Sequence, residues 1–165
     1  MQGLDLLRTR RSIRSFCLRA VERRLLEDIV DSARFAPTAR NVQPWEFVVV
    51  TDRPALCELA GMADNGRFLE QAPACIAVFC LDTKYYLEDG CAATCNILLS
   101  ATDSGLGSCW IAGDKKPYSS RVCSFLKAPA GMKLVSLVAL GYPAGVEAGA
   151  PQKRPLKDIL HWGSF

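Results

Sequence analysis

The chain has 165 residues, of which 50% are apolar and 22% are charged, and its formal net charge is +3. A chain of this length fits one domain and buries roughly 70% of its unfolded surface, so a core forms without disulfides or metals. The weak net charge gives no general argument for nucleic-acid binding. No apolar run reaches the ~20 residues of a membrane helix, and the first residues lack the apolar region of a signal peptide. We therefore expect a single cytoplasmic domain over residues 1–165.

Helices and strands alternate along the predicted chain. Apolar residues at helical spacing predict helices over 3–9, 21–35, 54–62, 86–104 and 118–126. Apolar and β-branched runs predict strands over 44–50, 74–81, 107–113 and 132–142. This order predicts an α+β or α/β sandwich with helices packed on one central sheet. The remaining residues, 143–165, are rich in Pro, Gly and Ala, and predict an extended tail that lies on a surface such as a partner's.

The chain is poor in the side chains that usually carry catalysis. Its eight cysteines form no C-x-x-C pair, the usual arrangement of zinc and iron–sulfur ligands, so we expect reduced packing thiols and no metal site. His161 is the single histidine, and the sequence has no Walker A, G-x-S-x-G or H-E-x-x-H motif. Such a chain does chemistry more easily through a bound organic cofactor.

Arginines crowd the first twenty residues, and the densest part reads RRSIR over residues 10–14. Guanidinium groups match phosphate oxygens in a bidentate way, and a serine hydroxyl adds a further donor. The segment therefore suits a local anionic ligand. The alternatives are a solvated basic stretch or a contact with nucleic acid.

The predicted loop between the second helix and the first strand reads PTARNVQPW over residues 37–45. Asn41 and Gln43 each carry a carboxamide that both donates and accepts hydrogen bonds, which suits the pyrimidine edge of a flavin or a nucleobase. The alternative is turn chemistry, with Asn41 as a cap and Trp45 in the core.

Small residues precede an aromatic residue in the segment GLGSCWIAG, residues 105–113. Small residues let a backbone approach a planar ring closely, and the alternative is tight packing between sheet and helix. The tail carries a basic pair, Lys153 and Arg154, which taken alone indicates only solvated charge.

Together and in this order, these segments resemble the nitroreductase family of FMN-dependent oxidoreductases. RRSIR, APTARNVQPW and GLGSCWIAG are similar to three recurrent segments of that family, and KRPLKDILH resembles its closing segment. The resemblance covers essentially the whole chain. It implies an α+β three-layer sandwich with a central mixed sheet flanked by helices. It also implies an intertwined homodimer in which the tail, residues 143–165, wraps the partner subunit.

The resemblance implies that the two ends of the chain meet at the cofactor phosphate. Arg10, Arg11 and Ser12 would hold the phosphate and ribityl chain of FMN. Lys153 and Arg154 would close over the same phosphate.

The resemblance implies a second set of contacts around the flavin ring. Arg14 would approach the N1–C2 edge, and Asn65 would contact the pyrimidine edge. The other subunit would supply Pro37, Thr38, Asn41 and Gln43. Backbone groups near N5 would come from Trp110, Ile111, Ala112 and Gly113.

The implied reaction passes hydride from NADH or NADPH to a nitroaromatic, a quinone or a similar small acceptor, by a ping-pong mechanism at flavin N5 without a catalytic side chain. A cation about 4 Å from N1 in a partly buried site is worth up to roughly 4 kcal/mol. That energy would raise the flavin potential by several tens of millivolts. Hydride transfer needs stacking geometry and water exclusion rather than a titrating base.

Two departures from the family pattern concern the surroundings of the flavin. Few residues separate Leu81 from the long helix, whereas larger members carry a helical excursion there, so we expect a more open site. Ala39 and Arg40 replace small hydroxyl residues in the loop.

Two alternatives to turnover stay open. The first is a flavin-binding or flavin-consuming protein of the same fold. The second treats residues 8–19 as a nucleic-acid patch, which lacks interleaved aromatic residues beyond Phe16.

Overall fold

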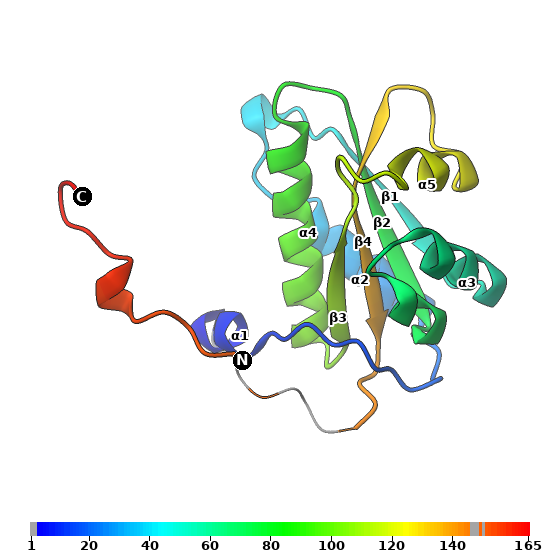
Figure 1. Ribbon diagram of the computed structural model, residues 1–165, viewed down its shortest axis with the longest axis horizontal. Coiled ribbons are helices and arrows are strands. Elements are labelled where there is room, and N and C mark those ends of the chain that lie inside the picture. Colours follow the sequence, from blue (N-terminus) through cyan, green and yellow to red (C-terminus); the bar gives the residue numbers. More distant parts are fainter. Residues whose placement is uncertain (1–2, 146–148, 150) are drawn as a thin grey trace.

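A computed structural model describes residues 3–145, 149 and 151–165 (Figure 1). The α-helices of the described residues are α1 (Gly3–Thr9), α2 (Arg23–Ala33), α3 (Arg53–Met62), α4 (Tyr86–Asp103) and α5 (Ser119–Phe125). The strands are β1 (Trp45–Val50), β2 (Ala74–Leu81), β3 (Gly107–Ala112) and β4 (Met132–Gly141). Short 3-10 turns cover Ala39–Asn41, Arg67–Gln71 and Leu156–Asp158. The predicted helices and strands are all present, with bounds that differ by two residues or fewer.

The strands form one sheet in the order β1-β2-β4-β3, and every neighbouring pair is antiparallel. Ala77 of β2 lies opposite Val48 on one side and Leu137 on the other, and a bulge follows between Val78 and Phe79. The expected mixed sheet is therefore wrong for the described part of one chain. Apolar runs predict that strands are buried but carry no information about their direction.

Helices cover both faces of the sheet and make three layers (Figure 1). One core lies under α2 and α4 and includes Ile76 and Val138, whereas the other lies under α3 and α5 and includes Phe79 and Leu137. The central strands β2 and β4 are buried on both faces over most of their length, which explains their largely apolar sequences. The predicted α+β sandwich is confirmed.

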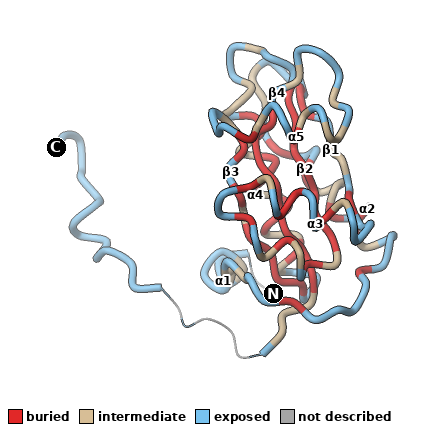
Figure 2. The backbone as a smooth tube through the Cα atoms, turned by 45° about the vertical axis from the view of Figure 1, so that its right-hand side comes forward, coloured by how far each residue is buried: buried red, intermediate tan, exposed pale blue. Residues whose placement is uncertain are grey.

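The two ends of the chain are the least buried parts (Figure 2). Helix α1 has no buried residue, and every residue of 151–165 is exposed. Part of the tail predicted over 143–165 lies outside the described residues, at 146–148 and 150. Among the described residues, no helix is both long enough and apolar enough to cross a membrane.

Candidate functional site

The arginine segment lies along β3, at one edge of the sheet. Ser12 forms a parallel bridge with Ser108, and the Ile13 amide donates to the Ser108 carbonyl at 2.9 Å. A Cβ added to Gly107 would approach the Ile13 side chain to 2.8 Å, so glycine at this position lets the segment lie against the strand. The sheet thus fixes the backbone that carries the arginines.

The guanidinium groups of this segment have no carboxylate partner among the described residues. Arg11 Nη1 donates to the carbonyls of Arg8 and Arg10 at 2.6 and 2.9 Å. Arg14 Nη1 donates to the Ser12 carbonyl at 3.4 Å, and its guanidinium lies 5.8 Å from the Phe68 ring centroid. These cations are held by backbone and ring contacts, which leave their charge free to attract an anion.

The arginines on α2 and the one at its C-cap, Arg34, differ, because carboxylates on that helix pair with them. Arg23 lies 2.8 Å from Glu27, and Arg34 lies 2.6 Å from Asp31. Arg24 pairs with Asp28 at 3.4 Å. Arginines near α2 are therefore neutralised by carboxylates, whereas those over residues 10–14 are not, within the described residues.

The charges of the arginine segment affect the pKa of the Cys109 thiol on β3. Burial raises the pKa of its thiol, and the charges of Arg14 and Arg10 and a hydrogen bond with Ser12 oppose that rise. The thiol therefore lies within the influence of three of the predicted cofactor contacts.

The turn that contains Asn65 lies beside the same edge of the sheet. A Cβ on Gly66 would lie 3.5 Å from Ile111 Cδ1, and Phe68 lies under the Arg14 guanidinium. Asn65 itself is exposed. The structure thus brings its turn together with the arginine segment and β3.

The predicted ring contacts on and after β3 divide between the two faces of the sheet. Trp110 packs with the core under α4, whereas Ile111 is buried in the core under α3 and α5. The Ala112 carbonyl accepts a hydrogen bond from the Tyr118 hydroxyl. The Gly113 amide donates to the Val135 carbonyl at 3.0 Å.

The small size of Gly113 has a packing role, because an added Cβ would lie 2.6 Å from Leu134 Cγ. The packing alternative raised by the sequence thus applies here. The segment is packed tightly, and it also runs beside the arginines.

The loop over residues 37–43 lies at the other end of α4. Thr38 Oγ1 donates to Asp89 Oδ2 at 2.9 Å, and the Ala39 amide donates to Asp89 Oδ1 at 3.1 Å. Asp89 is in the first turn of α4, about 21 Å along the helix axis from Asp103 at its end. β3 begins just after that far end, and the arginine segment lies beside the start of β3. One chain therefore does not bring the loop and the arginines together (Figure 1).

The basic pair of the tail is also apart from the arginine segment. Lys153 and Arg154 are exposed, and Arg154 Nη2 donates to the Asp158 carbonyl at 2.9 Å. Neither hydrogen-bonds to Arg10, Arg11 or Ser12 in the part of the chain that the structure describes. The tail extends away from the body (Figures 1 and 2).

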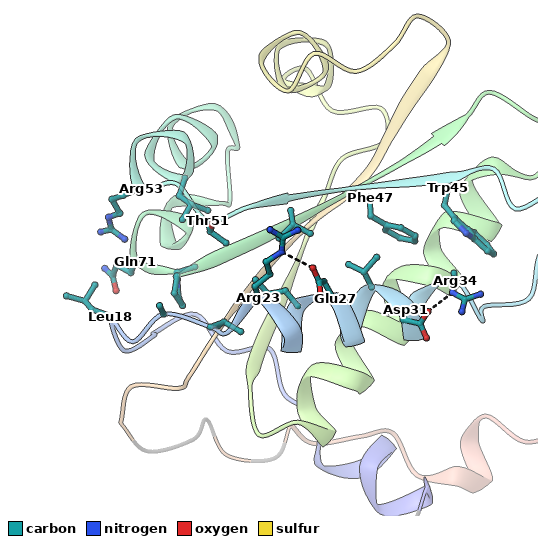
Figure 3. A pocket seen from close by; sticks show the side chains of 18 of the residues that line it. Leu18, Arg23, Glu27, Asp31, Arg34, Trp45, Phe47, Thr51, Arg53 and Gln71 are labelled. Carbon is teal, nitrogen blue, oxygen red and sulfur yellow. Dashed lines mark hydrogen bonds and ion pairs between the residues drawn. The ribbon is translucent and has the colours of Figure 1, made fainter.

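A groove of about 1200 Å³ lies between α2 and β1. Its floor is apolar and includes Trp45, Phe47 and Val49 of β1, and the ion pairs of α2 lie on its wall (Figure 3). β1 is an edge strand, so its outer backbone groups are free to pair with another strand. This groove suits an extended, partly apolar segment of chain.

Asp89 is the residue of this region that the sequence did not identify. Its side chain is buried, with 5% exposure, and both of its oxygens contact the loop. The only signal in the sequence is a carboxylate near the start of an otherwise apolar helix, where acids are common for reasons of helix electrostatics.

The protein is an α+β sandwich with a cationic segment on an edge strand. This segment has no carboxylate partner in the described residues. The model of the nitroreductase family matches residues 7–73 and 63–142, and the chain belongs to this family. This confirms the resemblance that the sequence motifs indicated.

Known proteins similar to the chain have names that describe more than one activity. A protein of Archaeoglobus fulgidus named "Putative NADH dehydrogenase/NAD(P)H nitroreductase" is 36% identical, over 85% of this chain and 84% of its own. The solved structure of an FMN-dependent nitroreductase of Clostridium difficile R20291 superposes with a TM-score of 0.90, at 28% identity, over 98% of this chain and 99% of its own. An iodotyrosine deiodinase of Haliscomenobacter hydrossis is 28% identical, over 82% of this chain and 76% of its own.

Proposed function

We propose that the chain binds FMN at a homodimer interface and passes hydride from NADH or NADPH to a small electrophilic acceptor such as a nitroaromatic or a quinone. The observation that carries this proposal is the arginine segment, fixed on β3 with its guanidinium groups unpaired by carboxylates in the described residues. The names of the relatives support an FMN-dependent oxidoreductase that uses a nicotinamide donor.

The donor set fits a phosphomonoester. Arg10 and Arg11 supply cations, and Ser12 supplies a hydroxyl beside them, so they would hold the phosphate and the ribityl chain. The hydroxyl of Ser108, the residue that pairs with Ser12, is buried and has no hydrogen-bond partner within the described residues. The site therefore offers charge and polar groups that the chain itself leaves unused.

The second subunit would complete the site. The loop over residues 37–43 and the pair Lys153 and Arg154 lie away from the arginine segment of their own chain, which is expected if they serve the partner's cofactor. The tail carries exposed apolar side chains, among them Leu156, Ile159 and Trp162. These suit the apolar groove at β1.

The same arrangement would extend the sheet. A partner's tail paired with the outer edge of β1 would add a strand to it. The tail over 143–165 would then hold the two subunits together.

FMN, when bound, supplies hydride acceptance and hydride donation at its N5 atom. The chain's own residues would hold and orient the cofactor and shield it from water. Arg14 would place positive charge at the N1–C2 edge and stabilise the negative charge of the reduced ring. Arg14 is exposed in one chain, so the partner must exclude water for this charge to act strongly.

No side chain of the site needs to move a proton at the ring. His161, the single histidine, is exposed in the tail. Only residues 82–85 join β2 to α4, which leaves the approach to the ring open on this side. An open site suits a ping-pong reaction in which nicotinamide leaves before the acceptor enters.

All eight cysteines are free thiols, and disulfides persist mainly in oxidising compartments, which supports a cytoplasmic location.

The absorption spectrum of the purified protein tests the proposed function. We expect a flavin spectrum that bleaches under anaerobic conditions when NADH or NADPH is added and returns when a nitroaromatic or a quinone follows. Tight FMN binding without bleaching would favour the flavin-binding alternative. A colourless monomer that ignores added FMN would refute both.

A further inference from the structure

We propose that Asp89 is a positioning residue that clamps the loop over residues 38–43 in the one conformation that presents Asn41 and Gln43 to the cofactor. The second half of this statement rests on the proposed function, whereas the clamp itself does not. Asp89 is buried, and its two carboxylate oxygens accept from Thr38 Oγ1 and the Ala39 amide at 2.9 and 3.1 Å.

The loop needs such a clamp because its backbone is strained. Arg40, Asn41 and Gln43 have φ values of 56°, 58° and 50°, in the left-handed region that side-chain-bearing residues rarely adopt. None of these positions carries glycine, so surrounding contacts must hold this conformation in place. Strain of this kind concentrates where a protein orients groups for a ligand.

The hydrogen bonds that start at Asp89 continue through the loop. Thr38 Oγ1 donates to the carboxylate and accepts from the Gln43 amide at 3.1 Å. The Gln43 carboxamide in turn donates to the Asn41 carbonyl at 3.4 Å. Because the Thr38 hydroxyl has one hydrogen, a pure acceptor at position 89 fixes its direction and leaves its lone pairs for Gln43.

The carboxylate can transmit this order because its own position is rigid. The next residue, Gly90, allows α4 to lie close against the sheet, where an added Cβ would approach Val135 Cγ2 to 2.7 Å and Cys80 Sγ to 2.9 Å. Asp89 therefore cannot shift without moving α4 on the core.

Helix capping is the plainer explanation of an acid in the first turn, and it does not account for these contacts. A capping carboxylate accepts from amides at the start of its own helix. In the described residues the hydrogen-bond donors to Asp89 are in the loop, some fifty residues earlier in the chain. The geometry thus assigns Asp89 to the loop.

Trypsin cleavage after Arg40 measures the clamp without any cofactor. Arg40 is exposed and followed by Asn41, so local opening of the loop controls the cleavage rate. In the FMN-free protein, we expect Asp89→Ala to raise this rate by about tenfold or more. Asp89→Asn should give an intermediate rate, because an amide keeps one acceptor oxygen but offers donors in place of the other.

Thr94→Val is the matched control, because it alters another buried polar residue of α4. Thr94 Oγ1 contacts the Gly90 carbonyl at 2.7 Å and Ser136 Oγ at 2.8 Å, away from the loop. We expect this variant to lower the melting temperature and to change cleavage after Arg40 by no more than about twofold.

FMN titration by flavin fluorescence measures the second half of the proposal. We expect Asp89→Ala to raise the Kd for FMN by about tenfold or more and Thr94→Val to leave it within about twofold. Where Asp89→Ala fails to fold, Thr38→Val breaks the same hydrogen bond from the loop side and leaves α4 intact, and the same rise in cleavage after Arg40 is expected.

Each outcome decides one part. Equal cleavage of Asp89→Ala and Thr94→Val would overturn the clamp. Faster cleavage with unchanged FMN affinity would overturn the positioning role while leaving the proposed function intact. A wild-type protein that binds no FMN would overturn the proposed function, and the cleavage rates would still decide whether Asp89 holds the loop.

Discussion

The two basic ends of the chain differ in what holds them. The segment over residues 10–14 lies on β3, bridged to Ser108 and packed over Gly107. The tail over residues 151–165 is also basic, but every one of its residues is exposed. One end is placed by its own chain, and the other is not.

Under the proposed function, this difference separates the part of the site that one chain would build from the part that needs a second chain. The arginine segment would form half of the proposed anion site by itself, because the sheet fixes its backbone and no carboxylate of the described residues neutralises it. The tail gains a defined place only when something covers its apolar side chains. If both ends serve one phosphate, the site exists only in the assembled dimer.

Removal of residues 151–165 is expected to have the largest effect, because it tests whether the tail holds two subunits together. We expect the dimer to weaken by at least about 100-fold, because exposed aromatic and aliphatic anchors such as Trp162 carry most of the energy of an interface. The body of the chain should still fold, since none of the removed residues is buried. Sedimentation velocity of the two proteins measures the effect.

A double variant separates the charge of the tail from its packing. Lys153→Ala with Arg154→Ala should keep the dimer and weaken FMN binding by about tenfold or more, because it removes two cations from the phosphate. A truncated chain that remains a dimer with unchanged FMN affinity would contradict any role for the tail.

Another prediction compares two arginines. Arg10→Ala should weaken FMN binding by roughly 10- to 150-fold, the equivalent of about 1.5–3 kcal/mol for a charged hydrogen bond. Arg24→Ala should leave FMN binding within about twofold, because Arg24 is exposed and pairs with Asp28 on α2. Fluorescence titration with FMN measures both, and equal losses would show that general charge, rather than the placed segment, attracts the cofactor.

A further prediction compares two glycines, one in contact with the arginine segment and one that is not. Gly107→Ala should destabilise the fold by about 1–3 kcal/mol, because the new methyl group would lie 2.8 Å from the Ile13 side chain. It should also weaken FMN binding, since Ile13 lies between the residues proposed to hold the cofactor. Gly61→Ala on α3 meets no atom within 4 Å and should stabilise the fold by up to about 1 kcal/mol. Urea denaturation measures both changes, and an unaltered Gly107→Ala protein would show that the segment is loosely held.

The helices and strands were predictable because apolar periodicity is a local signal. Strand β2 is a continuous apolar run, β4 is largely apolar, and α4 has the pattern of a long helix with small residues against the sheet. Strand direction was not predictable in this way. The sheet is antiparallel although helices connect several of its strands, and long connections allow either direction.

The segments of the candidate site could be identified from the sequence, whereas their arrangement in space could not. The pairing of Ser12 with Ser108 spans most of the chain and leaves no local trace in the sequence. The left-handed conformations of Arg40 and Gln43 could not be anticipated, because residues with long side chains seldom adopt them. Asp89 is recognisable only when Thr38 and the Ala39 amide are placed against it.

The smallest expected effect is a change in the pKa of the Cys109 thiol caused by the charges of the arginine segment. Burial raises the pKa of this thiol, and the charges of Arg14 and Arg10 lower it. Only the thiolate reacts with iodoacetamide, so at pH 8 we expect Cys109 to react more slowly than the exposed Cys57. In the FMN-free protein, Arg14→Gln should move the midpoint of the Cys109 pH–rate profile upward, because it removes a charge that favours the thiolate.

Arg34→Gln is the control for this shift, because Arg34 is the residue that follows α2 and is paired with Asp31. Mass spectrometry of the peptide that contains Cys109 follows the reaction residue by residue, and the midpoint of its pH profile is independent of how slowly the reagent reaches a buried thiol. A midpoint that moves equally in both variants would mean that the field at Cys109 comes from the whole protein. A midpoint that moves only with Arg14 would show that the sheet holds the segment close enough to act on its neighbours before any ligand arrives, which is what a preformed anion site requires.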